Sequence, residues 1–379
     1  MRFVTDLSKG ILGKADSVEL WEEIISYIPD SVFLKDNVKI LLPAAGHGTE
    51  ADFIVKRMAA LGRTATEIKN SIYLLDKYRV FTKSLQRRGY TNVVCADFIE
   101  WETDMKFDVV IGNPPYQKPG GSDRMGSRGS SSLWDKFVFK GLELLNSDGY
   151  LGFIHPPAWR KPKERYGLWN ELTKNNQMIF LKMRSGRREQ NIFNIGVRFD
   201  YYIVQKTPKH TTTVVIDHED KSHILDLDKF NWLPNYAISE ISNMLGNSCQ
   251  VLYNTAYHTQ HEHSDIQTGD FFNPVVHTIN QKGIGIKYFK DKKTDIHFGV
   301  PKVLLNQNEL QYPVNDFEGK YGMSQLTFGI SIKTKEEGDK IVEFLNSDKG
   351  KRIIAATKWN TFYTDYNMFA DFNKDWYVK

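Results

Sequence analysis

Short apolar runs alternate with amphipathic stretches over the first half of the chain. The apolar runs have the length of buried strands, and the stretches between them repeat apolar residues at helical spacing. Strands are predicted at residues 38–45, 71–76, 92–98, 107–112 and 150–155, and helices at about residues 50–61, before Gly89 and at about 133–145. This alternation is typical of a parallel, doubly wound α/β sheet. Ligands of such sheets bind at the carboxyl ends of the strands.

The pattern changes after about residue 207. Short strand-like pieces, loops rich in Asn, His and Tyr, and scattered helices replace the regular alternation. We expect a domain boundary within residues 206–209. The chain would then consist of a first domain, residues 1–206, and a second domain of mixed α+β structure, residues 210–379.

A glycine-containing loop follows the first predicted strand and opens a helix. Glycines let the backbone approach a ligand closely, and the helix N-terminus offers free amides. The residues expected to contact a cofactor here are Pro43, Ala44, Ala45, Gly46 and Gly48. Such a loop on its own is as often a simple tight turn.

Two acids end the next two predicted strands. Asp76 is placed to accept hydrogen bonds from ribose hydroxyls, as in dinucleotide-binding folds. Asp97, with Phe98 beside it, is placed to accept a hydrogen bond from an adenine amine. Each acid alone is more often a helix cap or a solvated loop residue. Three ligand-type features at three strand ends together indicate a nucleoside-containing cofactor.

The tetrapeptide Asn113-Pro114-Pro115-Tyr116 directly follows the fourth predicted strand. An amine attached to an aromatic ring is a poor nucleophile, because its lone pair is conjugated with the ring. The Asn113 side-chain oxygen and the Pro114 carbonyl can accept its two hydrogens and localise that lone pair. The prolines restrict the backbone, and Tyr116 gives a flat face for stacking on a base. The alternative is a rigid proline turn without a catalytic role.

These motifs resemble a known family of enzymes. The runs LLPAAGHG, CADF and VIGNPPYQ are similar to those of the Eco57I-type, γ-order adenine-N6 DNA methyltransferases of restriction-modification systems. The resemblance is specific over about residues 38–206. It implies a Rossmann-like methyltransferase sheet, S-adenosylmethionine as the cofactor, and an adenine flipped out of the duplex. By the same resemblance, Phe193 would sandwich the flipped base together with Tyr116.

One position departs from the family pattern. The family usually carries an acid two residues before the Ala-Ala pair, where it binds the amino group of the cofactor, and this chain has Leu42. Glu50, or Asp6 beside Thr5 in the N-terminal arm, could replace it. Thr5 is therefore included among the expected cofactor-binding residues.

The charge distribution adds a second indication of nucleic acid. The net charge of the chain is only +4, whereas residues 156–206 contain eleven Lys or Arg against four acids. Basic charge beside a catalytic face suits phosphate contacts. The residues predicted to bind DNA are Arg160, Lys161, Lys163, Arg187 and Arg188. A solvated surface without a partner is the alternative reading of this excess.

The cysteines, the histidines and the apolar runs of the chain argue against a disulfide-rich, metal-binding, secreted or membrane protein. The two cysteines, Cys95 and Cys249, cannot build a disulfide framework or a cysteine zinc site. The spacing of His258, His261 and His263 matches no metal signature, so no metal is predicted. Charges interrupt the first residues, unlike a signal peptide, and no apolar run is long enough for a membrane span. A cytoplasmic protein is expected.

The sequence thus predicts a site-specific DNA adenine-N6 methyltransferase, with residues 210–379 recognising the target. Double-stranded DNA is the expected partner. No nuclease motif is found, so a restriction endonuclease would be a separate protein. A methyltransferase for RNA adenine or for a protein glutamine amide stays open, because both present a planar, conjugated nitrogen. A non-catalytic nucleic-acid-binding module is the alternative from another class.

Overall fold

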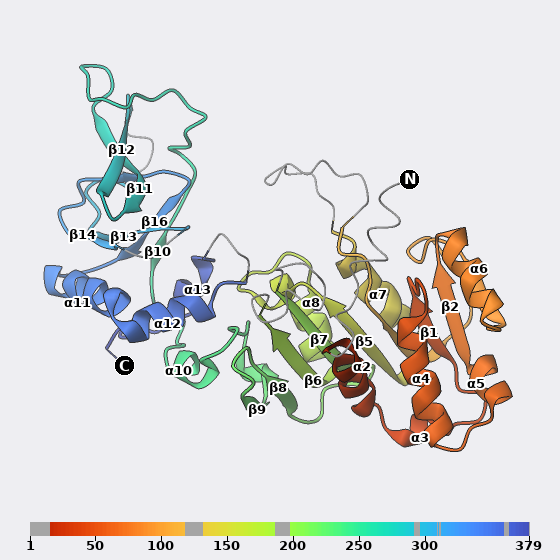
Figure 1. The fold of residues 1–379 in the computed structure, drawn as a ribbon. Helices are drawn as coiled ribbons and strands as arrows, with labels where there is room; N and C mark the ends of the chain where they lie inside the picture. The colour runs from red at the N-terminus through yellow and green to blue at the C-terminus, as the bar shows by residue number, and fades with distance from the viewer. Residues whose placement is uncertain are drawn as a thin grey trace. The chain divides into compact units, whose positions relative to one another are not determined.

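The computed structural model describes residues 16–117, 132–185, 198–291, 296–308, 310, 312–359 and 364–378 (Figure 1). The chain forms two compact units. The first runs to Trp159 and resumes from Glu164 to Asn231. The second consists of the short segment Arg160–Lys163 and the chain from Trp232 onward.

The first unit is built on a nine-stranded sheet with the order β3-β2-β1-β4-β5-β7-β6-β8-β9. The strands are β1 (Ile40–Pro43), β2 (Ile72–Asp76), β3 (Asn92–Cys95), β4 (Phe107–Gly112), β5 (Leu145–His155), β6 (Gln177–Arg184), β7 (Phe199–Gln205), β8 (Thr213–Ile216) and β9 (Ser222–Leu225). All pairings among β1 to β5 are parallel, so the predicted α/β class is confirmed. Strand β7 runs antiparallel between β5 and β6.

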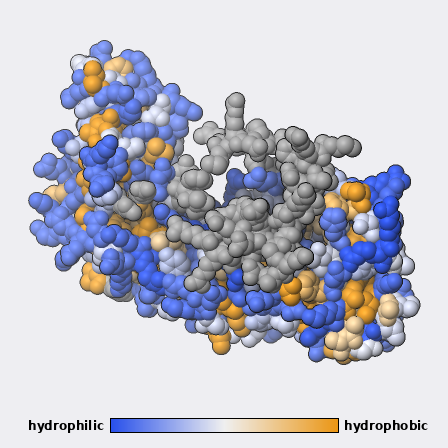
Figure 2. Space-filling model, viewed as in Figure 1, coloured by the Kyte–Doolittle hydropathy of each residue, from blue (hydrophilic) through white to orange (hydrophobic). Residues whose placement is uncertain are grey.

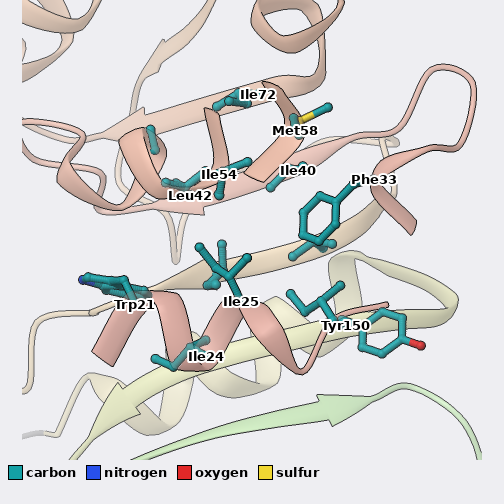
Figure 3. Close-up of a cluster of buried hydrophobic side chains, with 14 of the residues drawn as sticks. Trp21, Ile24, Ile25, Phe33, Ile40, Leu42, Ile54, Met58, Ile72 and Tyr150 are labelled. Carbon is teal, nitrogen blue, oxygen red and sulfur yellow. The ribbon is translucent and has the colours of Figure 1, made fainter. Parts of the chain in front are cut away.

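Helices α4 (Thr49–Ala60), α5 (Ala65–Ser71), α6 (Arg79–Arg87) and α7 (Trp134–Leu144) lie in the connections between the parallel strands. Helices α2 (Asp16–Ser26) and α3 (Asp30–Phe33) precede β1, and α8 (Leu168–Asn170) follows β5. Trp21 and Ile25 of α2 pack with Ile54 of α4 and Leu42 of β1 in one buried cluster (Figure 3). Leu42, which stands at the position of the family's acid, is therefore a core residue. Burial of these apolar side chains fixes both helices on the sheet.

The second unit is mixed α+β, as expected. It contains a four-stranded sheet in the order β10-β16-β13-β14 and a three-stranded sheet in the order β12-β11-β15. The strands are β10 (Val251–Leu252), β11 (Asn273–Asn280), β12 (Gly283–Phe289), β13 (Lys302–Asn306), β14 (Val314–Asp316), β15 (Gly322–Met323) and β16 (Thr327–Ser331), and the helices are α10 (Ile238–Ser242), α11 (Lys335–Asn346), α12 (Asp348–Ala356) and α13 (Asn367–Ala370). Its core is rich in aromatic rings, among them Trp232, Trp359 and Trp376.

The division between the units lies between Asn231 and Trp232, later in the chain than the expected boundary at residues 206–209. Strands β8 and β9 lie beyond residue 209 and still extend the first sheet, because β8 pairs in parallel with β6. Apolar alternation in two four-residue strands is too short a pattern to assign them to a sheet.

The segment Arg160–Lys163 belongs to the second unit through specific polar contacts. Arg160 is fully buried, and its guanidinium donates to the Leu233 carbonyl at 3.0 Å and to the Asn235 Oδ1 at 2.8 Å. The Leu233 amide donates back to the Arg160 carbonyl at 3.0 Å. Lys161 forms an ion pair with Asp365 at 3.0 Å, and its side chain is partly exposed.

Replacing Arg160 by alanine should destabilise the protein far more than replacing its neighbour Lys161. The first change leaves buried acceptors without a donor and should lower the free energy of unfolding by about 2–4 kcal/mol. The second removes a partly exposed ion pair and should cost at most about 1 kcal/mol. Urea unfolding of both variants measures the difference, and equal effects would contradict the assigned role of Arg160.

Candidate active site

The loop after β1 has the unusual backbone that its sequence predicts. Gly46 and Gly48 have φ of +53° and +77°, values in the left-handed region that favours glycine. A Cβ added to Gly46 would meet no described atom within 4 Å, so the space beside it is open. The loop leads directly into α4, whose first amides are free of helical partners.

Asp76 links this loop to the end of β2. Its Oδ2 accepts the Gly46 amide at 2.9 Å, and its Oδ1 accepts the Tyr78 amide at 2.8 Å. The carboxyl group is buried, and this burial raises its pKa against the opposing effect of the two amides. A carboxylate has about four acceptor sites, so further donors such as ribose hydroxyls can still be accepted. Asp76 thus lies beside the glycine loop, which is the position expected of a residue that binds a cofactor together with that loop.

Asp97 lies on the same edge of the sheet. Strand β3 pairs with β2 so that Cys95 stands opposite Asp76, and Asp97 follows two residues later. Its side chain is exposed, accepts the Ile99 amide at 3.1 Å and lies 3.8 Å from the Lys77 Nζ. Phe98 is buried instead, with its ring 4.9 Å from the ring of Phe137. Phe98 therefore anchors the loop from the core side.

The turn formed by Asn113 to Tyr116 begins where β4 ends. Pro43 at the end of β1 is its neighbour, because an ideal Cβ placed on Gly112 would lie only 3.1 Å from the Pro43 carbonyl oxygen. Asn113 is partly exposed, Pro114 is buried and Pro115 is exposed. The structure therefore brings the predicted catalytic turn and the predicted cofactor loop together.

Tyr116 stands against a buried polar group that the sequence did not reveal. Burial of its hydroxyl raises the Tyr116 pKa, and the nearby Asp200 carboxylate raises it further. Asp200 lies on β7, is fully buried and accepts the Trp159 Nε1–H at 2.9 Å. The residue as a whole is nevertheless partly exposed.

A second hidden group lies next to Asp200 in the sheet. His155 of β5 stands opposite Asp200 in the antiparallel register. Its Nδ1 donates to the Pro156 carbonyl at 3.0 Å, so Nε2 accepts from the Tyr202 hydroxyl at 2.9 Å. Burial lowers the pKa of His155 to about 4, and Trp134 stacks on the ring at 4.5 Å. The sequence signal for His155 and Asp200 was that both are polar residues in otherwise apolar strand segments.

The three predicted DNA-binding residues that the structure describes have different surroundings. Arg160 is buried and bound to protein acceptors, so the prediction that it contacts phosphate is wrong. Lys161 is paired with Asp365, whereas Lys163 is exposed.

Part of the basic excess in residues 156–206 also serves the fold. Lys174 donates to the Leu227 carbonyl at 2.7 Å, and Lys182 pairs with Glu23 at 3.0 Å. These cations are used internally, and a count of charges along the sequence cannot distinguish them from cations available to a ligand.

Several predicted site residues lie outside the described residues. They are Thr5, Arg187, Arg188 and Phe193, together with Asp6 and most of the glycine- and serine-rich loop at residues 118–132. The described residues on either side of that loop meet, since Gln117 and Ser132 form a bridge.

Metal and membrane features can be stated for the described part of the chain. No group of three His, Cys, Asp or Glu residues there is arranged to hold a metal ion. His263, one of the three closely spaced histidines of the sequence, stacks on Phe289 at 5.7 Å.

Within the described residues, no helix combines the length and the apolar character of a membrane span.

A comparison with known families matches the middle of the chain. The family model of the Eco57I restriction-modification methylase matches residues 51–184. This segment, about a third of the chain, is similar to that family. It contains Asp76, Asp97 and the turn from Asn113 to Tyr116, and the nine-stranded sheet around it has the α/β architecture that the resemblance implies.

Relatives of the methylase segment carry related names. An "Uncharacterized adenine-specific methylase" of Mycoplasma pneumoniae is 35% identical over 137 residues, covering 35% of this chain and 28% of the relative. The "Modification methylase CviBIII" of Paramecium bursaria Chlorella virus NC1A is 32% identical over 123 residues, covering 31% and 30%. This chain therefore matches less than a third of the length of either relative.

Among solved structures, that of the type IIG restriction endonuclease BpuSI is similar to this chain, and the match covers 96% of this chain and 58% of the BpuSI chain. The TM-score is 0.48 and the sequence identity is 12%.

Glu50 gives the protein a pH-dependent stability. It lies in the first turn of α4, and burial, with a smaller effect of the Asp52 carboxylate, raises its pKa from 4.5 to about 7. A carboxyl group with a raised pKa holds its proton more tightly in the folded chain. The folded state therefore loses stability as the pH rises from the unfolded-state pKa towards 7.

Glu50→Gln should accordingly be more stable than the wild type at pH 8, by about 1–2 kcal/mol because the side chain is partly exposed. At pH 4.5 the two proteins should be nearly equal. Urea unfolding at both pH values measures this, with the exposed Glu100→Gln as control. A wild type that is more stable than Glu50→Gln at pH 8 would contradict the account.

Proposed function

We propose that this chain is an S-adenosylmethionine-dependent methyltransferase that methylates the exocyclic N6 amine of adenine in duplex DNA. The observation that carries the proposal is the contact between Gly112 and Pro43. Because of this contact, the amine-binding turn after Gly112 and the cofactor loop after Pro43 begin next to each other at one edge of the sheet. Methyl transfer needs donor and acceptor held within reacting distance.

The turn suits an amine that is conjugated with a ring. The Asn113 side-chain oxygen and the Pro114 carbonyl are its two acceptors, and they act on the amine hydrogens as positive charge develops on nitrogen. Such interactions are worth most in the transition state. Tyr116, a partly exposed residue, would give the base a stacking surface next to them.

The cofactor loop suits S-adenosylmethionine. The open space beside Gly46 admits the close approach of a ligand, and Asp76 is held there by two backbone amides. Asp76 would accept the ribose hydroxyls, and the exposed Asp97 would accept the adenine amine of the cofactor. The bound cofactor supplies an activated methyl group, and these residues orient it towards Asn113.

The names of the relatives support adenine in DNA over the other planar amines. One relative is described as an adenine-specific methylase and another as a modification methylase. In this proposal an adenine must leave the base stack to reach Asn113. The second unit, from Trp232 onward, would recognise the target sequence.

The test is incubation of the protein with methyl-labelled S-adenosylmethionine and, in separate reactions, genomic DNA, total RNA and a protein extract. We expect label in DNA, recovered as N6-methyladenine after digestion to nucleosides. Asn113→Ala should lower the rate by about 10²–10³-fold while retaining cofactor and DNA binding. Label in RNA or in protein glutamine would overturn the substrate, and an unimpaired Asn113→Ala variant would overturn the site.

Replacement of Tyr116 should separate stacking from catalysis. Tyr116→Ala removes a stacking face worth about 1–3 kcal/mol per base, so the flipped base becomes less populated. Tyr116→Phe keeps the face and should retain most of the activity. Fluorescence of 2-aminopurine at the target position measures flipping. A Phe variant as impaired as the Ala variant would show that the hydroxyl, and not the ring, is required.

A further inference from the structure

Arg88 contacts the cofactor loop from the far end of α6. Its Nη1 donates to the His47 carbonyl at 2.5 Å and lies 3.5 Å from the Gly48 carbonyl. Its Nη2 forms an ion pair with Asp52 in the first turn of α4. One guanidinium therefore joins the loop to the helix that follows it.

The loop is shaped to admit this contact. A Cβ added to Gly48 would lie 2.6 Å from the Leu85 side chain and 3.0 Å from the Arg88 Nη1. Gly48 also has φ of +77°, so both its space and its backbone conformation exclude a side chain. The absence of a side chain at Gly48 lets the end of α6 approach the loop carbonyls.

The contact fixes the direction of a peptide group. In a trans peptide the carbonyl and the amide hydrogen point in opposite directions. When Arg88 holds the His47 carbonyl, the Gly48 amide must point the other way, and it donates to the Ala45 carbonyl at 2.7 Å. Asp76 holds the Gly46 amide from the opposite side. The loop is thus held at two points by side chains from two other elements.

We propose that Arg88 is a positioning residue that preorganises the loop at residues 44–48 for S-adenosylmethionine. This inference rests on the proposed function for the identity of the ligand. The loop needs such support because Ala44, Gly46 and Gly48 all have positive φ, and a loop that must be ordered on binding loses affinity. The guanidinium fork makes contacts that a single ammonium group cannot duplicate.

Arg87 provides a matched control. It is the neighbouring residue and is exposed. The surface of the molecule in the region of α6 is mostly hydrophilic (Figure 2). Among the described residues, the Arg87 side chain forms no ion pair and no hydrogen bond. Arg87→Ala and Arg88→Ala therefore remove the same charge from the same end of the same helix, and only the second removes the loop contact.

The first measurement is amide hydrogen exchange of the free protein. Arg88→Ala should exchange its Gly46 and Gly48 amides about tenfold faster than the wild type, because both depend on the loop geometry. The amides of β1 and β2 should be unchanged, and Arg87→Ala should match the wild type throughout. Unchanged Gly46 and Gly48 exchange in Arg88→Ala would overturn the proposal.

The second measurement is cofactor affinity by calorimetry, together with steady-state kinetics. Arg88→Ala should bind S-adenosylmethionine about three- to tenfold more weakly, as expected for a partly solvated charged contact. Its kcat at saturating cofactor should stay within about twofold of the wild type, since the contact acts before the chemical step. Arg88→Lys should recover part of the affinity, and Arg87→Ala should lose none.

The outcomes separate this inference from the proposed function. A wild-type protein that does not bind S-adenosylmethionine would refute the proposed function, and hydrogen exchange alone would then decide whether Arg88 orders the loop. A wild type that binds the cofactor, with an Arg88→Ala variant that binds it equally well, would refute the role of Arg88. An Arg88→Ala variant whose kcat falls as much as its cofactor affinity would also refute that role. An Arg87→Ala variant that loses as much cofactor affinity as Arg88→Ala would refute it too.

Discussion

The close approach of Gly112 to Pro43 is the constraint on which the site depends. Strands β1 and β4 pair in parallel with Leu41 opposite Val110, so their carboxyl ends finish side by side. A side chain at position 112 would press on the Pro43 carbonyl, 3.1 Å from an ideal Cβ. The missing side chain keeps the turn at Asn113 against the loop that begins at Pro43. In the proposed reaction these two loops hold the acceptor amine and the methyl donor.

The sequence predicts the parts of this arrangement that depend on local pattern. The five parallel strands were expected because apolar runs of strand length recur between amphipathic stretches. The relation between Asp76 and the glycine loop followed, since the carboxyl ends of parallel strands meet at one edge. The structure adds the atoms involved, with the Asp76 carboxylate accepting the Gly46 and Tyr78 amides.

The parts that were not predicted depend on contacts between distant segments. His155 and Asp200 are paired by an antiparallel register between β5 and β7, and the polar character of each residue in its own strand does not reveal that pairing. The basic character of residues 156–206 suggested a phosphate-binding surface, yet Arg160 is buried against Leu233 and Asn235. A sequence shows the charge of such residues, and only their burial distinguishes structural cations from cations available to a ligand.

The most direct measurement of the central claim is a crystal structure of the protein with S-adenosylhomocysteine. The account predicts that the ribose hydroxyls contact Asp76 and that the sulfur atom faces the Asn113 side chain across the contact between Pro43 and Gly112. A ligand bound elsewhere on the chain, or a sulfur atom turned away from the turn at residues 113–116, would contradict the account.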